Sequence, residues 1–379
     1  MFPIFTLPQS EADRRMSRNL RPWWNRGLTA LVLAGLAAFI FFGDRHKAEF
    51  SLIWRILNLG AIYAIAAVGY TVINGMTGQF SLGPHGFMLI GGYLATLLIL
   101  PLAKKRFVWI LEPLIEPFAS FSLPYSGFIL ALLGSGVVAV LAGLIVGIPA
   151  LRGLRGDYLA IATFGFGEIL FMLVVNLPSL TNGAMGVTGV PTYTNLAWSW
   201  GFLIALAYAA MRLKNSSYGR ALRAIREDEL AAESMGINVF RLKLLAFLFS
   251  AFCAGVSGGL MVALIGIAYP GLFSFFTTFY LLLIVVLGGL GSISGAIVGG
   301  LIFAAVFEAL RFIDTAVVPG MRMVVFAIIL ILVMLFFRRG LFGQGEFSWD
   351  GLIAAVQRGL GRLSGAGGGH GAGSSYPKA

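Results

Sequence analysis

Segment 212–243 holds the densest group of ionisable side chains in this chain, and it lies between two long apolar stretches. A charged segment within so apolar a chain has to lie in water, on one side of a membrane. Ion pairing and docking to a soluble partner are the chemistry that these side chains offer. The basic members are Arg212, Lys214, Arg220, Arg223, Arg226, Arg241 and Lys243, and the acidic members are Glu227, Asp228, Glu229 and Glu233.

This segment is expected to contain one short helix. Ser216 or Ser217 can cap its N-terminus, and Gly236 can end it. Arg223 and Glu227 are four residues apart, which is the spacing at which opposite charges pair on a helix surface. The alternative is a solvated loop that only sets the topology of the chain. The other face of the helix would carry a modest apolar stripe, made of Ala221, Leu222, Ile225, Ala231, Ala232 and Met235.

Polar residues within the apolar stretches are candidates for lining a pathway or a gate. Glu168 lies near the middle of one such stretch, where an ionisable group is a functional candidate. Irregular polar backbone at membrane depth is tolerated only where protein or a water-filled cavity covers it. The alternative for Glu168 is a hydrogen bond to a neighbouring helix, and the alternative for the other candidates is a role in helix packing. The remaining candidates lie in a glycine-interrupted stretch and are Asn74, Gln79, Ser81 and His85.

Two further pairs have both a functional and a structural interpretation. Thr181 and Asn182 lie in an uncharged loop, where they could line the outer mouth of a pathway or bond the loop backbone. Glu308 and Arg311 are three residues apart and are expected to neutralise each other on one helix.

Residues for covalent chemistry are nearly absent from this sequence. It contains no GxxxxGK[ST] phosphate-binding loop, no HExxH and no G-x-S-x-G, and its three histidines are far apart. Its one cysteine, Cys253, excludes a disulfide framework within the chain. The expected protein is therefore not an enzyme, and it has no catalytic residue, metal site or cofactor.

Composition indicates an integral membrane protein. Of the 379 residues, 58% are hydrophobic and 11% are charged, whereas about a quarter are charged in a typical soluble domain. The net charge is +11. The basic residues flank the apolar stretches instead of forming one basic face, so they indicate contact with a lipid bilayer and not with nucleic acid. The expected fold class is all-α, a polytopic helical membrane protein.

About ten transmembrane helices are expected, because about 20 helical residues cross the apolar core of a bilayer. Pro and Gly interrupt the third, eighth and ninth, so a re-entrant or broken helix is the alternative there. The predicted spans are 27–43, 51–73, 85–103, 126–150, 157–177, 197–212, 244–268, 276–291, 294–312 and 321–337.

The distribution of Lys and Arg predicts that both termini are cytoplasmic, because this orientation places 19 of the 27 basic residues inside. The basic cluster 104–106 is the main exception. Three parts are expected: a basic cytoplasmic N-terminus (1–26), a transmembrane domain (27–340) with a cytoplasmic loop (213–243), and a disordered glycine-rich cytoplasmic tail (341–379).

Several stretches resemble one family, the branched-chain amino acid permeases of ABC importers, in their M-type subunit. GRALRAIREDELAAESMGIN is similar to the cytoplasmic coupling loop of these permeases, although Leu230 stands where the general EAA-x-x-x-G signature has Glu. Residues 69–98, 149–191 and 285–303 also resemble the family. The likeness covers nearly all of the chain from about residue 50 to 340.

The resemblance implies the ABC importer permease fold and a bacterial inner-membrane location. It also implies four partner chains: two ABC ATPases, a second (H-type) permease subunit and a solute-binding protein. The ATPases would hydrolyse ATP and move the membrane helices through the coupling loop. The residues implied in this coupling are Gly219, Arg220, Arg223, Arg226, Glu227, Asp228, Leu230, Ala231, Ala232, Glu233 and Gly236.

The expected function is ATP-driven import of branched-chain amino acids (Leu, Ile and Val). Related permeases carry urea or short amides. Nothing in the sequence identifies a pocket for a side chain such as that of isoleucine, so this alternative stays open. A proton-coupled secondary carrier that uses Glu168 is a further alternative from a different class.

Overall fold

The computed structural model describes residue 35 and residues 51–346, except 110–112, 117, 155, 312–320, 337–339 and 344. Residues 51–346 belong to one of two structural units in the chain. The predicted first span, the basic N-terminus and the tail after residue 346 are not covered by this description, apart from the single residue 35.

Two central helices lie against each other through glycine-lined surfaces. They are α4 (Pro84–Ile99) and α12 (Val239–Ile265). A Cβ atom added to Gly91 would lie 2.3 Å from the carbonyl oxygen of Gly255, so only glycine allows this approach. Small residues are the usual means by which helices pack closely in a membrane. The third helix of this layer, α6 (Phe128–Gly153), packs against both.

A second group of helices packs on the other side of α12. It begins with α3 (Ser51–Tyr70), which continues into a π-helical turn, η1 (Thr71–Met76). Gly300 and Ala64 form a close contact between α14 and α3, since a Cβ on Gly300 would lie 2.9 Å from that of Ala64. The other members of this group are α9 (Leu196–Asn215), α13 (Phe276–Gly288), α14 (Ile293–Ala309) and α16 (Met321–Phe336).

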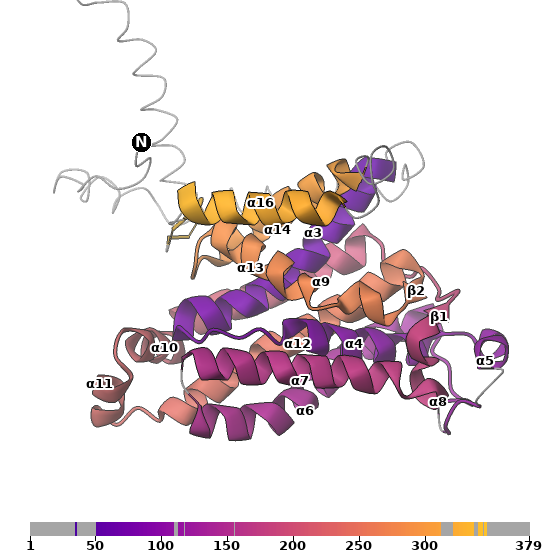
Figure 1. Cartoon of the computed structure of the whole chain (residues 1–379), viewed down its shortest axis with the longest axis horizontal. Helices are drawn as coiled ribbons and strands as arrows, with labels where there is room; N and C mark the ends of the chain where they lie inside the picture. Colours follow the sequence, from indigo (N-terminus) through magenta and orange to yellow (C-terminus); the bar gives the residue numbers. More distant parts are fainter. Residues whose placement is uncertain are drawn as a thin grey trace, which may run out of the picture. The chain divides into compact units, whose positions relative to one another are not determined.

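The two ends of this unit carry different short elements (Figure 1). One end carries α10 (Ser217–Glu227) and α11 (Glu229–Ser234). The other end carries the remaining short elements, which are α5 (Leu102–Val108), α8 (Pro178–Thr181), and the antiparallel strands β1 (Val187–Thr188) and β2 (Ile267–Ala268). The helix α7 (Asp157–Val175) runs between the two ends.

The basic cluster at 104–106 lies in the short helix α5, beyond the end of α4. The chain bends by 119° between α4 and α5, so the predicted span 85–103 ends at Ile99. Lys105 donates to the carbonyl oxygens of Phe118 and Phe121 at 2.6 Å, and Lys104 donates to that of Gly189 at 2.8 Å. Loop carbonyls thus accept the hydrogen bonds of these lysines.

The predicted count of ten spans is not confirmed. Among the described residues, six helices are long and apolar enough to cross a membrane, and the bent α4–α5 pair would make a seventh. The helices α14 and α16 are shorter, at 17 and 16 residues. The six are Ser51–Met76, Tyr125–Gly153, Asp157–Val175, Leu196–Asn215, Val239–Ile265 and Pro270–Gly288.

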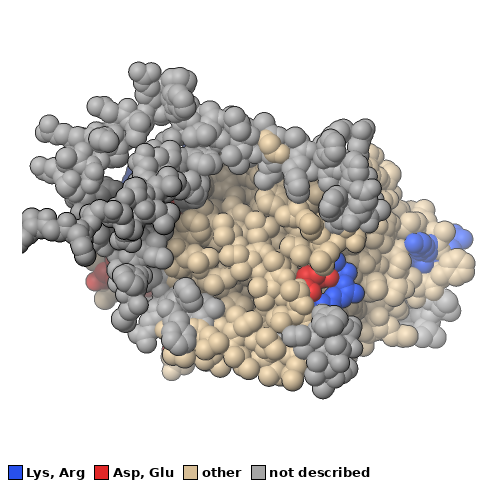
Figure 2. All heavy atoms as spheres, turned by 90° about the horizontal axis from the view of Figure 1, so that it is seen from above, with Lys and Arg blue, Asp and Glu red and all other residues tan. Residues whose placement is uncertain are grey.

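Much of the surface of these helices is apolar. Ile145 on α6 is 71% exposed and Ile161 on α7 is 65% exposed. Figure 2 shows one face on which charged atoms are sparse among the described residues. Such a face is suited to contact with lipid or with another apolar surface.

Candidate functional site

The charged segment folds as two short helices, α10 and α11, and not as the single helix that the sequence predicted. The Ser216 side chain caps α10 by accepting a hydrogen bond from the backbone N–H of Gly219 at 3.3 Å. Gly219 is buried, and a Cβ there would lie 2.3 Å from the carbonyl oxygen of Lys214. Glycine is therefore required where α9 turns into α10.

Asp228 separates the two helices. Its backbone is extended, with φ −155° and ψ 113°, and its Oδ1 accepts from the N–H of Ala231 at 3.0 Å. Asp is a strong N-cap residue because its carboxylate satisfies a free amide and favours the positive end of the helix. Gly236, with φ +80°, follows the end of α11. The cap at Ser216 and the end at Gly236 are thus confirmed, and the uninterrupted helix between them is wrong.

The apolar stripe is divided between two environments. Leu222, Ile225 and Ala232 are at most 4% exposed and pack on the chain itself. Leu230 and Met235 are 66% and 82% exposed. The segment is therefore anchored by one face, and it presents apolar side chains to solvent at α11.

Arg226 connects the segment to the transmembrane helices. Its Nη1 donates to the carbonyl oxygen of Gly75 at 2.9 Å, and its Nη2 contacts Glu227 Oε1 at 2.7 Å. The predicted pair of Arg223 with Glu227 is wrong, because Arg226 takes that carboxylate. Arg223 instead bonds the carbonyl oxygen of Gly219 on its own helix.

A second connection joins the same end of the unit to Glu346. Its carboxylate accepts from the N–H groups of Ile293 and Ser294 at 2.9 Å, and it pairs with Lys214. Burial opposes ionisation of this carboxyl, but the hydrogen bonds from Lys214, Ser294 and the backbone outweigh burial and lower its pKa. Glu346 therefore holds the end of α9 against the start of α14.

Two of the predicted pathway residues meet at the start of α4. The Nε2 atom of His85 lies 3.5 Å from Glu168 Oε1 on α7. The Nδ1 atom of His85 lies 2.9 Å from Thr278 Oγ1 on α13. The His85 side chain is fully buried, and that of Glu168 is 35% exposed. Thr278 was not among the residues predicted from the sequence, although the hydroxyl pair Thr277 and Thr278 interrupts an otherwise apolar run.

The coil between η1 and α4 is held by hydroxyl groups from three helices. Thr163 Oγ1 accepts from the N–H of Leu82 at 3.0 Å. The hydroxyl of Tyr70 donates to the carbonyl oxygen of Ser81 at 2.8 Å, and that of Thr278 donates to the carbonyl oxygen of Leu82 at 3.4 Å. Irregular backbone inside a membrane protein needs such partners. This coil ends where α4 begins at Pro84, one residue before the predicted start of the third span at residue 85.

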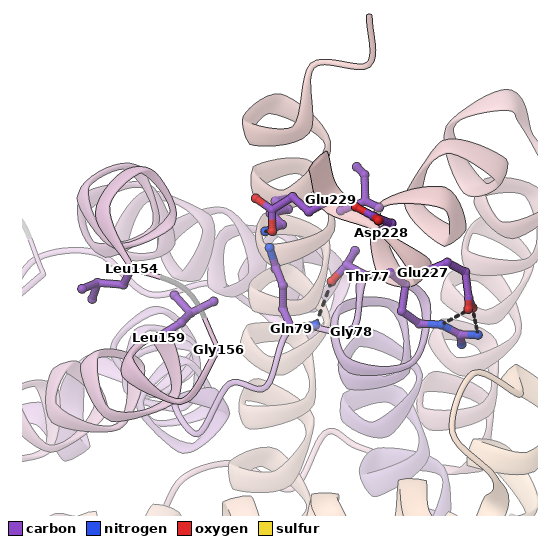
Figure 3. A pocket seen from close by; sticks show the side chains of 12 residues that line it. Thr77, Gly78, Gln79, Leu154, Gly156, Leu159, Glu227, Asp228 and Glu229 are labelled. Carbon is purple, nitrogen blue, oxygen red and sulfur yellow. Dashed lines mark hydrogen bonds and ion pairs between the residues drawn. The ribbon is translucent and has the colours of Figure 1, made fainter. Parts of the chain in front are cut away.

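Gln79 lies in this coil and differs from its neighbours. The residue is 5% exposed, yet neither polar atom of its amide has a hydrogen-bond partner. It lines a pocket of about 230 Å³ between the coil, α10–α11 and the start of α7 (Figure 3). Asn74 lies nearby in η1 and is half-buried. Buried polar groups without partners are rare in native proteins.

Thr181 and Asn182 bond the backbone of their own loop. Thr181 Oγ1 donates to the carbonyl oxygens of Val174 and Leu177, and Asn182 Nδ2 donates to that of Gly186 at 2.7 Å. The role of these two residues in a pathway stays a prediction.

The expected pair of Arg311 with Glu308 is confirmed at 2.9 Å. The buried Glu308 carboxylate also contacts Arg55 Nε at 3.3 Å, a partner from α3 that the spacing of the sequence could not indicate.

Comparison with known proteins places this architecture in a family. The family model described as branched-chain amino acid transport system / permease component matches residues 52–334. The chain is 34% identical over 291 residues to the high-affinity branched-chain amino acid transport system permease protein LivM of Escherichia coli (strain K12). The matched region covers 68% of this chain and 63% of that protein.

The chain is also 31% identical over 308 residues to the permease protein LivH of the corresponding Salmonella typhimurium system, over 76% of this chain and 94% of that protein. It thus spans less than two thirds of the LivM protein that it matches and nearly all of LivH. No solved structure matches it. Because the family model covers most of its length, the chain belongs to the permease-component family of branched-chain amino acid transport systems.

Proposed function

We propose that this chain is a membrane subunit of an ATP-driven importer for branched-chain amino acids. It would form the translocation pathway together with a second, H-type permease subunit, while two ABC ATPases supply the energy and a solute-binding protein delivers the substrate. The observation that carries this proposal is the anchored, partly apolar segment α10–α11, joined to η1 by the Arg226–Gly75 hydrogen bond. Similarity to permeases named LivM and LivH supports the substrate class.

The mechanism requires no covalent chemistry in this chain. An ATPase would contact the exposed side of the segment, including Leu230, Ala231, Glu233, Met235 and Gly236. The buried side, with Leu222 and Ile225, would carry the motion into the helix bundle. A packed interface responds to such a shift as a unit, because close-packed side chains transmit strain.

The pathway would follow the coil between η1 and α4 and the polar residues around it. The predicted pathway residues in this region are Asn74, Gln79, Ser81, His85 and Glu168. A pathway needs polar groups that are covered by protein yet can be reached when helices move apart, and the half-exposed Glu168 beside the buried His85 meets that description. Thr181 and Asn182 would lie at the outer mouth.

The proposed setting is the bacterial inner membrane, with both termini and α10–α11 in the cytoplasm. This orientation would place 19 of the 27 basic residues of the sequence in the cytoplasm, as the positive-inside rule expects.

Reconstitution of the complex tests the proposal. Wild-type chain should co-purify with ATPases and an H-type permease, and it should import leucine only with ATP and the binding protein. Ala231→Glu and Gly236→Trp, on the exposed side of α11, should abolish uptake without loss of the chain from the membrane. Ala231→Ser, which keeps a small side chain at the same exposed residue, is the matched control and should retain uptake.

The same preparation discriminates the alternatives. Import of urea or acetamide in place of leucine would support the short-amide reading. Leucine flux by the chain alone, driven by a pH gradient and lost in Glu168→Gln, would support a secondary carrier and overturn the proposal.

A further inference from the structure

The pocket beside α10–α11 is lined by three kinds of residue, which are apolar residues, charged residues and residues of the coil before α4. Its volume, about 230 Å³, is several times the roughly 30 Å³ that one water molecule occupies. Leu154 and Leu159 form an apolar side, and Ile225 of α10 is a further apolar lining residue. Charged side chains from α10–α11 and α12 form a second side, and the coil with Gln79 forms the third (Figure 3).

The charges around the pocket are largely paired. Glu229 contacts Lys243 at 2.6 Å, and Glu227 contacts Arg226 at 2.7 Å. Asp228 is the remaining lining carboxylate, and one of its oxygens caps α11. The lining thus carries one excess negative charge, which favours an ammonium group without excluding a carboxylate beside Lys243 or Arg226.

The Gln79 amide distinguishes between kinds of ligand. An amide places one acceptor and one double donor on neighbouring atoms, and both are buried here without a partner. An isolated cation would use only the oxygen, and an isolated anion only the nitrogen. A ligand with an ammonium and a carboxylate on one carbon would use both.

We infer that this pocket binds the zwitterionic head group of an aliphatic α-amino acid, with its side chain against Leu154, Leu159 and Ile225. The inference rests on the proposed function and locates a subsite for the substrate at the end of the chain that carries α10–α11. A ligand there would touch the coupling segment and the coil at once. Its binding would therefore stabilise the arrangement in which the segment is seated on the bundle.

Site-directed labelling tests this inference in the full complex in detergent. Cys253 is the only cysteine in the chain and is 0% exposed, so a charged maleimide should not reach it. Leu154→Cys places a reporter in the pocket. Gly153→Cys, at an exposed residue of α6 next to Leu154 but outside the lining, is a control at the same end of the unit, because an added Cβ there meets nothing within 4 Å. Leucine should slow labelling of the first variant several-fold and leave the second unchanged.

Two analogues and one substitution sharpen the test. Isoamylamine lacks the carboxylate and 4-methylpentanoate lacks the ammonium group, so each should protect much less than leucine. Adding Gln79→Leu to the reporter should raise the leucine concentration for half-protection about tenfold or more, since hydrogen bonds to charged groups contribute about 1.5–3 kcal/mol. Leu159→Trp, which fills the pocket from its apolar side, is a second variant if Gln79→Leu does not fold.

Absence of protection by leucine, equal protection by isoamylamine, or unchanged half-protection in both Gln79→Leu and Leu159→Trp would overturn the inference. These results are distinguishable from failure of the proposed function. A complex that imports leucine with ATP but shows no protection refutes only the subsite. A complex that does not import leucine refutes the proposed function itself.

Discussion

The guanidinium of Arg226 and the carbonyl oxygen of Gly75 form a 2.9 Å hydrogen bond between α10 and the π-helical turn η1. Gly75 in turn approaches the loop before α14, since a Cβ on it would lie 2.4 Å from the backbone nitrogen of Gly291. Arg226 of α10 thus contacts η1, which continues α3, at a point that packs against the loop between α13 and α14. Motion of α10 therefore has a direct route to the group of helices that contains α3, α13 and α14.

Replacing Arg226 should impair coupling. Arg226→Met keeps the length of the side chain but removes the hydrogen bond to Gly75, so ATP-driven uptake should fall about tenfold, the equivalent of about 1.4 kcal/mol. Transport by the reconstituted complex measures this, with membrane levels of the chain as a check. Arg223→Met, at a residue that bonds only its own helix, is the matched control. Equal losses in both variants would show that positive charge, and not the bond to Gly75, is what matters.

The Thr278 side chain should contribute more to the stability of the chain than that of its neighbour Thr277. Thr278→Val removes the partner of His85 Nδ1 and of the Leu82 carbonyl oxygen, and leaving such buried groups unsatisfied costs about 1–3 kcal/mol each. Thr277 makes a single long hydrogen bond, at 3.4 Å. Thermal unfolding of the purified chain should show a clear loss of stability for Thr278→Val and little change for Thr277→Val. The opposite order would contradict the assigned role of Thr278 in holding the coil.

A single methyl group should separate α4 from α12. Gly91→Ala introduces a Cβ 2.3 Å from the Gly255 carbonyl oxygen, so it should destabilise the chain by about 1–3 kcal/mol, the usual cost of overpacking. Gly165→Ala, on α7, meets no atom within 4 Å. It should raise stability by up to about 1 kcal/mol through helix propensity. Chemical denaturation of both variants measures the difference, and similar values would refute the close approach.

Stability should depend on the ionisation of Glu346. Its pKa in the folded chain lies below the ordinary value of 4.5, so its carboxylate contributes stability above pH 4.5, and that contribution is lost as the pH falls through the lowered pKa. Glu346→Gln should therefore destabilise the chain at pH 7 by about 1–2 kcal/mol. The difference from wild type should shrink as the pH falls below 4.5. A difference that is independent of pH would contradict the ion pair with Lys214.

Local signals were sufficient for much of the coupling segment. Ser216 and Gly236 mark its ends because a hydroxyl cap and a left-handed glycine act within a few residues of themselves. The break at Asp228 was not predicted, because Asp can lie inside a helix or cap one. Burial of Ile225 and Ala232, on either side of the break, decides between these two structures.

The sequence by itself determined an apolar helical membrane chain, the position of its one long charged segment and the absence of familiar catalytic motifs. These are properties of composition and of near neighbours along the chain. Only the tertiary structure decided that His85 lies beside Glu168, that Arg226 donates to the Gly75 carbonyl oxygen and that Glu346 caps α14. Those contacts join residues 52 to 151 positions apart, and which partners meet depends on how closely glycine-lined helices pack.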